Sequence, residues 1–291
     1  MSDKIKTDEK KQHFDDIYVK TNPVPYKTEI LDKLEYISDN NNRQMFDRMI
    51  LPWIKETQEK DGKPLNYVDL CACFGNTTMA TVYGMTYDQI CENWKDEASC
   101  MTIQGERRFK CHSTSIDISA NAMAYGKKVG LFDEAIVVDL NDTGLVEAQA
   151  QVHRAMSEAD IFLSTAALVY LDIAAIERLV AAFASKATEG YMLVNFLNPF
   201  SLEKADETKR VLLKHLEFVG SMAARHRKMS QLEQDNYPGE TWALLELWVL
   251  RRKEKSVPWT YCRSTLFFLE GLLNLIALTE GKIEDFSGSS N

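Results

Sequence analysis

Short apolar runs alternate with amphipathic stretches over residues 65–252 of this chain. An apolar run of about four to eight residues is typical of a buried strand, and apolar residues three and four apart are typical of a helix. The pattern therefore predicts βαβ units around a mostly parallel sheet that helices cover on both faces. Strands are expected at 65–71, 113–118, 135–140, 159–165, 191–196 and 242–250, and helices at 76–83, 120–129, 144–157, 173–186 and 203–220.

The segments on either side of this core have other patterns. Residues 13–64 carry aromatic residues and helical periodicity, which predicts an N-terminal helical cover. Residues 1–12 are polar and without period, as in a disordered tail. The core is expected at 65–254 and a C-terminal appendage at 255–291, whose apolar stretch could pack on its own chain or join two copies in a homodimer.

Composition narrows the class of partner and the compartment. The net charge of −9 argues against a general nucleic-acid binder, which needs a basic face, and leaves small molecules and other proteins. The N-terminus lacks the apolar centre of a secretory signal, and no apolar run reaches the ~18 residues of a membrane span. We expect a cytoplasmic protein with six reduced cysteines and, because no paired C-x-x-C motif is present, without a metal site.

The loop after the first strand is the first candidate site. In an open α/β sheet, ligands bind beyond the carboxyl ends of the strands, which here places them at residues 69–78, DLCACFGNTT. Small residues let a ligand approach the backbone, and Gly75 can take a positive φ. Asn76 and Thr77 are suited to open a helix whose first amides point into the site.

Acidic residues follow at the next two strand ends. Asp117 can accept the hydroxyl protons of a ribose, and Asp139 beside Leu140 suits an adenine amino group. The ordered set predicts a ligand of the adenosine type. The expected cofactor-binding residues are Asp69, Cys71, Cys73, Gly75, Asn76, Thr77, Asp117, Ile118, Asp139, Leu140, Ser164 and Thr165.

Two phosphate-binding motifs are missing from this loop. A dinucleotide site needs G-x-G-x-x-G and a P-loop needs G-x-x-x-x-G-K-[ST], and the chain has neither. A ligand without phosphate relaxes the need for glycine. S-adenosylmethionine is such a ligand, and we expect it as the cofactor.

The stretch YVDLCACFGNTT resembles the first motif of class I S-adenosylmethionine-dependent methyltransferases. Asp117 and Asp139-Leu140 are similar to the acids of the second and third motifs, and ADIFLST to the fourth, so the resemblance covers about 65–252. Cys71 and Cys73 replace two glycines of the common D-x-G-x-G-x-G pattern. The resemblance implies a Rossmann-like, doubly wound sheet of seven strands, mostly parallel with an antiparallel last strand supplied by 190–252.

The spacing between the first two motifs departs from the family pattern. The distance from Gly75 to Asp117 exceeds one helix and a turn, which predicts a helical insertion over 85–111 near the cofactor. Together with DDIYVKTNPVPY before the core, this insertion is similar to a methyltransferase-like subgroup with an N-terminal helical cover and a D-x-C-x-x-x-G first loop.

The chemistry expected is in-line methyl transfer to a small-molecule acceptor, for which the enzyme positions a nucleophile and excludes water. Tyr170 could place its ring against the sulfonium by a cation–π contact, or be an ordinary core aromatic. The expected catalytic residues are Tyr170 and Asn195, and the expected acceptor-binding residues are Tyr18, Tyr26, Asn198 and Arg225. The tyrosines could instead be helix packing, and the basic cluster 225–228 a solvated turn rather than a carboxylate clamp.

Two other functions stay open at this point. One is a cyclising enzyme of the same fold that forms azetidine-2-carboxylate and methylthioadenosine from the cofactor. The other is a non-catalytic S-adenosylmethionine-binding partner protein. Product analysis separates them, because S-adenosylhomocysteine needs an acceptor and methylthioadenosine does not.

Overall fold

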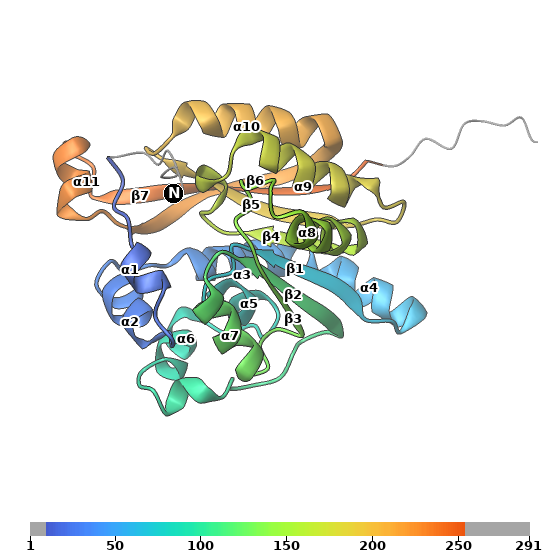
Figure 1. Cartoon of the computed structure of the whole chain (residues 1–291), viewed down its shortest axis with the longest axis horizontal. Helices are drawn as coiled ribbons and strands as arrows, with labels where there is room; N and C mark the ends of the chain where they lie inside the picture. The colour runs from blue at the N-terminus through green and yellow to red at the C-terminus, as the bar shows by residue number, and fades with distance from the viewer. Residues whose placement is uncertain (1–9, 254–291) are drawn as a thin grey trace, which may run out of the picture. The chain divides into compact units, whose positions relative to one another are not determined.

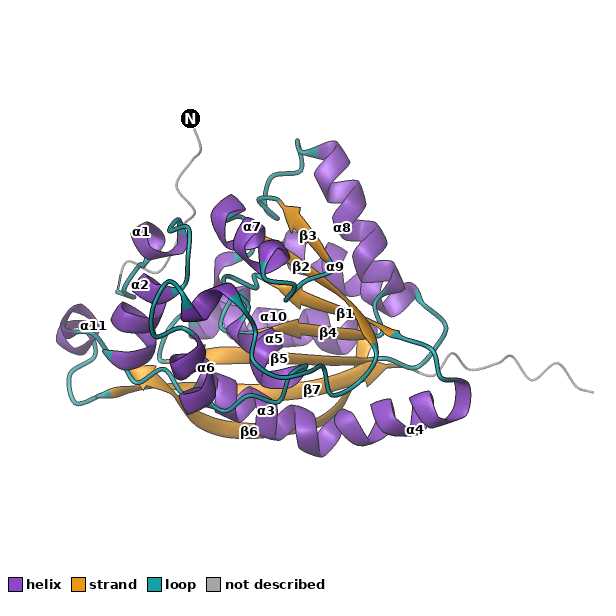
Figure 2. Cartoon of the chain, turned by 90° about the horizontal axis from the view of Figure 1, so that it is seen from below, coloured by secondary structure: helices purple, strands orange, loops and turns teal. Residues whose placement is uncertain are grey.

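Seven strands form one mixed sheet in the computed structural model, which describes residues 10–253. The strand order is β3-β2-β1-β4-β5-β7-β6, with β1 to β5 parallel to one another and β7 antiparallel to both β5 and β6 (Figures 1 and 2). This confirms the Rossmann-like doubly wound sheet with an antiparallel last strand. The strands are β1 Leu65–Leu70, β2 Cys111–Asp117, β3 Glu134–Val137, β4 Ile161–Ser164, β5 Tyr191–Asn198, β6 Leu216–Lys228 and β7 Trp242–Arg252.

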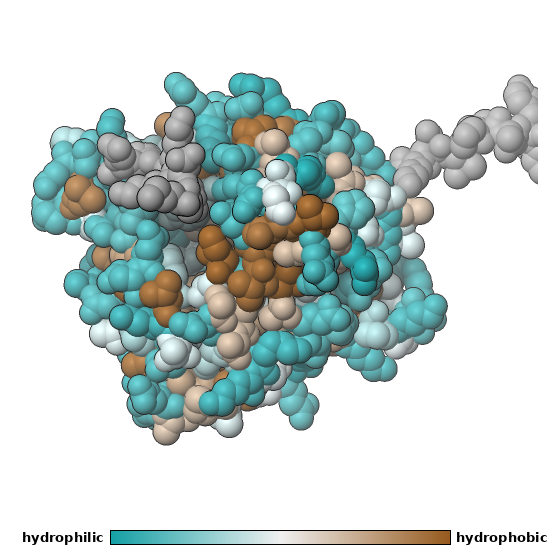
Figure 3. Space-filling model, in the orientation of Figure 1, coloured by the Kyte–Doolittle hydropathy of each residue, from teal (hydrophilic) through white to brown (hydrophobic). Residues whose placement is uncertain are grey.

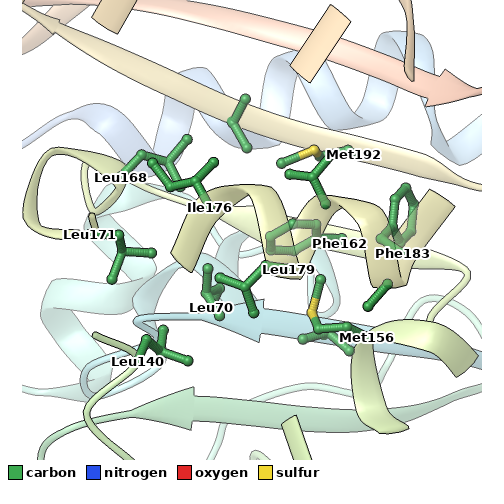
Figure 4. Packing of buried hydrophobic residues seen from close by; sticks show 14 of the residues in the cluster. Leu70, Leu140, Met156, Phe162, Leu168, Leu171, Ile176, Leu179, Phe183 and Met192 are labelled. Atoms are coloured by element: carbon green, nitrogen blue, oxygen red, sulfur yellow. The ribbon is translucent and has the colours of Figure 1, made fainter. Parts of the chain in front are cut away.

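Helices cover both faces of the sheet, because each strand buries side chains on both sides. In β1, Val68 and Leu70 join a core under α8, α9 and α10, whereas Leu65 and Tyr67 join a second core under α3 and α4. Figure 4 shows the first core, in which Phe162 and Met192 of the strands face Leu179 and Phe183 of α9. The helices are α1 Asp15–Tyr18, α2 Val24–Tyr26, α3 Ser38–Met49, α4 Leu51–Asp61, α5 Asn76–Thr81, α6 Tyr87–Asn93, α7 Ala120–Lys128, α8 Val146–Glu158, α9 Ile173–Ser185, α10 Leu202–His215 and α11 Gln231–Asn236.

The N-terminal segment and the insertion form a third core with α5 and α7. A π-helical segment, Lys27–Asp32, follows α2, and a 3₁₀ turn, Ser99–Met101, follows α6. Tyr26 packs edge-on against Trp94, with ring centroids 6.0 Å apart, and the Trp94 indole donates to the Tyr125 hydroxyl at 3.1 Å. The insertion expected over 85–111 is therefore helical only in part: α6 and the 3₁₀ turn support the N-terminal segment, residues 102–110 are irregular, and Cys111 begins β2.

The prediction of a helix over 203–220 is wrong at its end, because α10 stops at His215 and β6 begins at Leu216. β6 is an edge strand that pairs with β7 alone. The residues in its middle are small and half-exposed, so the sequence lacks the apolar run that is typical of a buried strand. The basic cluster 225–228 closes this strand and is not a solvated turn. The third strand also ends at Val137 rather than 140, and the chain bends at Ile50 between α3 and α4.

The outer face drawn in Figure 3 is mostly hydrophilic, with an apolar area where α8 and α9 lie in Figure 1. Val146, the first residue of α8, is 74% exposed, and α8 and α9 border a groove of 370 Å³. Within residues 10–253, no helix combines the length and the apolar character that a membrane crossing requires. The expectations for residues 1–9, for the appendage at 255–291 and for its apolar stretch at 266–278 fall outside the described residues.

Arg252 at the end of β7 is buried and fixes the ends of neighbouring elements. Its guanidinium donates to the backbone carbonyls of Phe183 at 2.7 Å and Thr188 at 3.1 Å, and to that of Ala159, and it lies 4.1 Å above the Phe183 ring. We expect Arg252→Met to lower the free energy of unfolding by about 3–5 kcal/mol, because several buried carbonyls lose their donor.

Urea unfolding followed by circular dichroism measures this loss. The control is Arg251→Met on the same strand, whose half-exposed side chain pairs with Glu217 at the surface and whose removal should leave the midpoint unchanged. Equal midpoints for the two variants would contradict the structural role of Arg252.

Candidate active site

A cavity of 220 Å³ lies at the carboxyl ends of β1, β2 and β4. The strand order reverses at β1, which lies between β2 and β4, and such a reversal opens a crevice in which α/β proteins bind ligands. Most of the residues expected from the sequence line this cavity: Tyr18, Tyr26, Cys71, Cys73, Asn76, Thr77, Asp117, Ile118, Asp139, Leu140, Thr165 and Tyr170.

The loop after β1 has left-handed backbone at every second residue. The φ angles are 54° at Cys71, 50° at Cys73 and 88° at Gly75. These are the positions of the three glycines in the pattern that the loop resembles, so the two cysteines take the glycine conformation at a cost in strain. A Cβ on Gly75 would lie 2.2 Å from Leu131 Cδ2, so this glycine allows close packing under the loop rather than contact with a ligand.

The two loop cysteines are neutral thiols. Burial, and then the negative charge of Asp117, raise the pKa of Cys71 and of Cys73 well above the usual thiol value. A buried neutral thiol behaves as a small apolar group, and neither cysteine is activated as a nucleophile.

Asp117 joins the loop to the end of β2. Its carboxylate accepts backbone N–H bonds from Cys73 at 2.9 Å and Ser119 at 2.8 Å, and burial raises its pKa although both amides oppose the rise. A carboxylate has about four acceptor positions, so Asp117 can accept further hydrogen bonds from a ligand in the cavity. This geometry fits a pair of neighbouring hydroxyl groups.

Asp139 and Leu140 reach the cavity from the turn beyond β3. Asp139 Oδ1 accepts the Asn141 N–H at 2.9 Å, and Gln149 of α8 donates to the Asp139 carbonyl at 3.1 Å. The Asn141 side chain in turn donates to the Tyr170 carbonyl at 3.1 Å. The turn is therefore held against the 3₁₀ segment Leu168–Tyr170, which carries Tyr170.

Six residues expected at the site do not line the cavity. Asp69 and Asn195 are buried beneath it: Asp69 accepts the Thr78 hydroxyl at 2.6 Å, and Asn195 accepts the Ala166 N–H at 2.5 Å. Asn198 and Arg225 are exposed, and Arg225 lies 4.8 Å above the Trp242 ring. The remaining two are Gly75 and Ser164.

A buried polar network from α3 supports the loop and was missed in the sequence. Asp39 accepts from Asn76 Nδ2 at 2.9 Å and from the Thr77 hydroxyl at 3.3 Å, and burial raises its pKa to about 6. Asn42, one turn further, donates to the Thr165 hydroxyl at 2.8 Å. The signal available was a pair of polar residues three apart at the start of a helix that packs on the core.

Lys11 lines the cavity without having been predicted, and from the basic cluster 225–228 His226 and Arg227 line it whereas Arg225 does not. The buried Lys11 ammonium lies 4.8 Å from the centre of the Tyr170 ring and donates to its hydroxyl. Arg227 forms a buried ion pair with Glu233, whose Oε1 also accepts the Gln12 N–H at 2.9 Å. The ion pair thereby holds residues 11–12 over the cavity, and the Tyr170 hydroxyl lies next to a cation.

Aromatic side chains close the cavity on the N-terminal side. Tyr18 and Tyr26 have ring centroids 6.0 Å apart, and Tyr26 packs against Tyr36 at 6.5 Å. Burial raises the pKa of all three hydroxyls well above the usual value, so they remain neutral. They exclude water from the cavity without adding charge.

Comparisons with known proteins give similarity in structure only. No family model matches the chain, and no curated protein matches its sequence. The magnesium protoporphyrin IX methyltransferase of Synechocystis PCC 6803 has 10% identity and a TM-score of 0.40, covering 79% of this chain and 84% of its own. The geranyl diphosphate C-methyltransferase of Streptomyces coelicolor A3(2) has 12% identity and a TM-score of 0.38, covering 74% and 85%.

The sheet defines the fold class. The strand order and the antiparallel β7 are those of a Rossmann-like, doubly wound sheet, and the loop after β1 lies where the motif resemblance implied. The family resemblance of the sequence motifs and the fold therefore agree.

Left-handed backbone at Cys73 leads to a prediction about loop stability. An L-residue in this conformation costs about 1–2 kcal/mol, which glycine avoids while losing about 0.5–1 kcal/mol of chain entropy. We expect Cys73→Gly to be more stable than Cys73→Ala by up to about 1 kcal/mol in urea unfolding. At Ala72, whose φ is not positive, replacement of alanine by glycine should lower stability. If glycine were less stable than alanine at position 73 as well, the strain at Cys73 would be contradicted.

Asp69 leads to a prediction about pH. Burial, and to a lesser extent the charges of Asp39 and Asp117, raise its pKa to about 7 from an ordinary value of 3.8. Between these values the folded chain keeps a proton that the unfolded chain has lost, so stability falls as pH rises from about 4 to 7.

Asp69→Asn removes this dependence. Relative to the variant, the wild-type free energy of unfolding should fall by roughly 1–3 kcal/mol between pH 4.5 and 7.5, measured with urea. Asp142→Asn, at an exposed carboxylate, is the control. A constant difference between wild type and Asp69→Asn at both pH values would exclude the proton on Asp69.

Proposed function

We propose that this chain is an S-adenosylmethionine-dependent methyltransferase that acts on a small-molecule acceptor. The observation that carries the proposal is the Asp117 carboxylate at the end of β2, with acceptor positions to spare and directed into the cavity by the left-handed loop after β1. Asp139 and Leu140 follow at the end of β3, in the order that ribose and adenine require.

The chemical groups that line the cavity also match the parts of S-adenosylmethionine. Asp117 would hold the ribose hydroxyls, Asp139 and Leu140 the adenine, and the loop at 71–73 the methionine part. The cofactor supplies an electrophilic methyl group when bound. Tyr170 would stabilise the positive sulfur through its ring face, while the Lys11 ammonium bonds to its hydroxyl; a contact of a cation with the ring face contributes about 0.5–2 kcal/mol.

A small acceptor is favoured by the closure of the site. Tyr18 and Tyr26 cover the cavity from the N-terminal side, and the net charge of −9 opposes binding of nucleic acid. The acceptor would therefore enter the space between these tyrosines and Tyr170.

The size of the cavity favours a second candidate, a cyclising enzyme of the same fold. Its volume of 220 Å³ is below the roughly 300–1,000 Å³ of sites for drug-sized ligands, so a bound cofactor leaves little room for an acceptor. A reaction within the cofactor, with azetidine-2-carboxylate and methylthioadenosine as products, needs no such room. Chromatography of the products separates the candidates: S-adenosylhomocysteine supports the first and methylthioadenosine the second.

Calorimetry with S-adenosylmethionine tests the shared site. We expect Asp117→Ala to weaken binding about 10- to 100-fold, because hydrogen bonds to a charged group contribute about 1.5–3 kcal/mol each. The control is Asp142→Ala, an exposed acid after β3 that does not line the cavity. Unchanged affinity in folded Asp117→Ala would refute the ribose assignment, and affinity without turnover in wild type would indicate a non-catalytic binding protein.

A further inference from the structure

A β-bulge near the end of β6 leaves two consecutive side chains, His226 and Arg227, facing the cavity. Arg225 pairs with Leu244 and Arg227 with Ala243, so two positions on β6 face a single step of β7, and His226 is the extra residue. A bulge shifts the alternation of a strand and re-aims its side chains. As a result His226 and Arg227 are both buried, 3% and 2% exposed, and both line the cavity, while Arg225 faces outward.

Ser38, the first residue of α3, fixes the His226 ring. The Ser38 Oγ lies 2.5 Å from His226 Nδ1 and 3.3 Å from the His226 carbonyl oxygen. A hydroxyl has one proton, so both contacts are satisfied when Nδ1–H donates to Ser38 and the Ser38 hydroxyl donates to the carbonyl. This assignment leaves the lone pair of the imidazole on Nε2.

The Nε2 atom has no hydrogen-bond partner within residues 10–253. His226 lines the cavity, so the second ring nitrogen lies beside the space that a ligand would occupy. Burial, and then the charges of Arg227 and Lys11, hold the pKa of His226 well below its ordinary value. The titratable or charged groups that line the same cavity are Lys11, Asp15, Cys71, Cys73, Tyr18, Tyr26, Tyr36, Asp117, Asp139, Tyr170 and Arg227.

We propose that His226 Nε2 accepts the proton of the attacking atom in the reaction at this site, with Ser38 as its positioning residue. The proposal rests on the proposed function. A bond forms between the nucleophilic atom and the carbon attached to sulfur, the carbon–sulfur bond breaks with its electron pair on sulfur, and the proton of the nucleophile moves to Nε2. The acceptor class is therefore one that carries an N–H, O–H or S–H group. The same balance holds for cyclisation, in which the nucleophile is an amine.

His226 also has a structural role, because its backbone carbonyl accepts the Ile37 N–H at 3.0 Å. The variant must therefore separate this role from that of the imidazole. Replacement by glutamine keeps this backbone contact and removes the base. His215→Gln is the matched control, because His215 bonds to Glu177 at 2.6 Å away from the cavity.

The experiment has a binding arm and a turnover arm. Calorimetry with S-adenosylmethionine should give the same affinity, within about twofold, for wild type, His226→Gln and His215→Gln. Consumption of S-adenosylmethionine, alone and with a panel of small amines, phenols and thiols, should fall about 10²-fold or more in His226→Gln only. The deficit should shrink as pH rises, because a nucleophile that loses its proton to solvent no longer needs Nε2.

Equal turnover in His226→Gln and wild type would overturn the proposal while leaving the proposed function intact. Absence of S-adenosylmethionine binding to wild type would instead refute the proposed function.

A spectroscopic arm decides the question where no acceptor in the panel reacts. Two-bond ¹H–¹⁵N spectra of the full chain with S-adenosylhomocysteine should show His226 as the neutral Nδ1–H form at pH 7, identified by its loss in His226→Gln. Ser38→Ala should mix the two neutral forms. An imidazolium, or an Nε2–H form in wild type, would overturn the proposal.

Discussion

The site depends on the reversal of strand order at β1. The chain leaves β1 toward β2 and β3 on one side and returns to β4 on the other, so the loops above these carboxyl ends diverge and leave a crevice. The loop after β1 must turn back across this crevice within a few residues, which it does through left-handed backbone at Cys71, Cys73 and Gly75. Asp117 accepts the Cys73 amide and thereby fixes the strained loop to the neighbouring strand.

Support for this loop comes from parts of the chain far away in sequence. The Asp39 carboxyl in α3 accepts hydrogen bonds from the side chains of Asn76 and Thr77. Asn42, also in α3, donates to the Thr165 hydroxyl beyond β4. Buried acids of this kind are costly unless hydrogen-bonded, which explains why each has hydroxyl or amide partners. The first turn of α3 therefore orients the β1 and β4 loops together, and it also contributes the hydroxyl that holds His226.

The cover over the crevice is held by charge. The buried ion pair of Arg227 and Glu233 joins the end of β6 to α11. Glu233 also accepts the Gln12 N–H, and this bond holds the neighbouring Lys11 next to Tyr170. The site is thus acidic where Asp117 and Asp139 lie and basic where Lys11 and Arg227 lie. Such a separation favours a ligand with hydroxyl donors at the acidic end and a negatively charged group at the basic end, because like charges repel.

The sequence by itself determined the βαβ order, the loop after β1 and the acids at the ends of β2 and β3, because these follow from local periodicity and from residues adjacent to strands. It failed for β6, whose small edge residues carry no burial pattern, and it did not show that Asn195 and Arg225 lie outside the cavity, because their direction depends on what packs around them. Lys11, Asp39 and His226 reach the site through contacts between segments far apart in the sequence, and a bulge adds Arg227. Tertiary structure alone decided these residues, because local periodicity carries no information about such contacts, and one extra residue in a strand changes which side chains face the cavity.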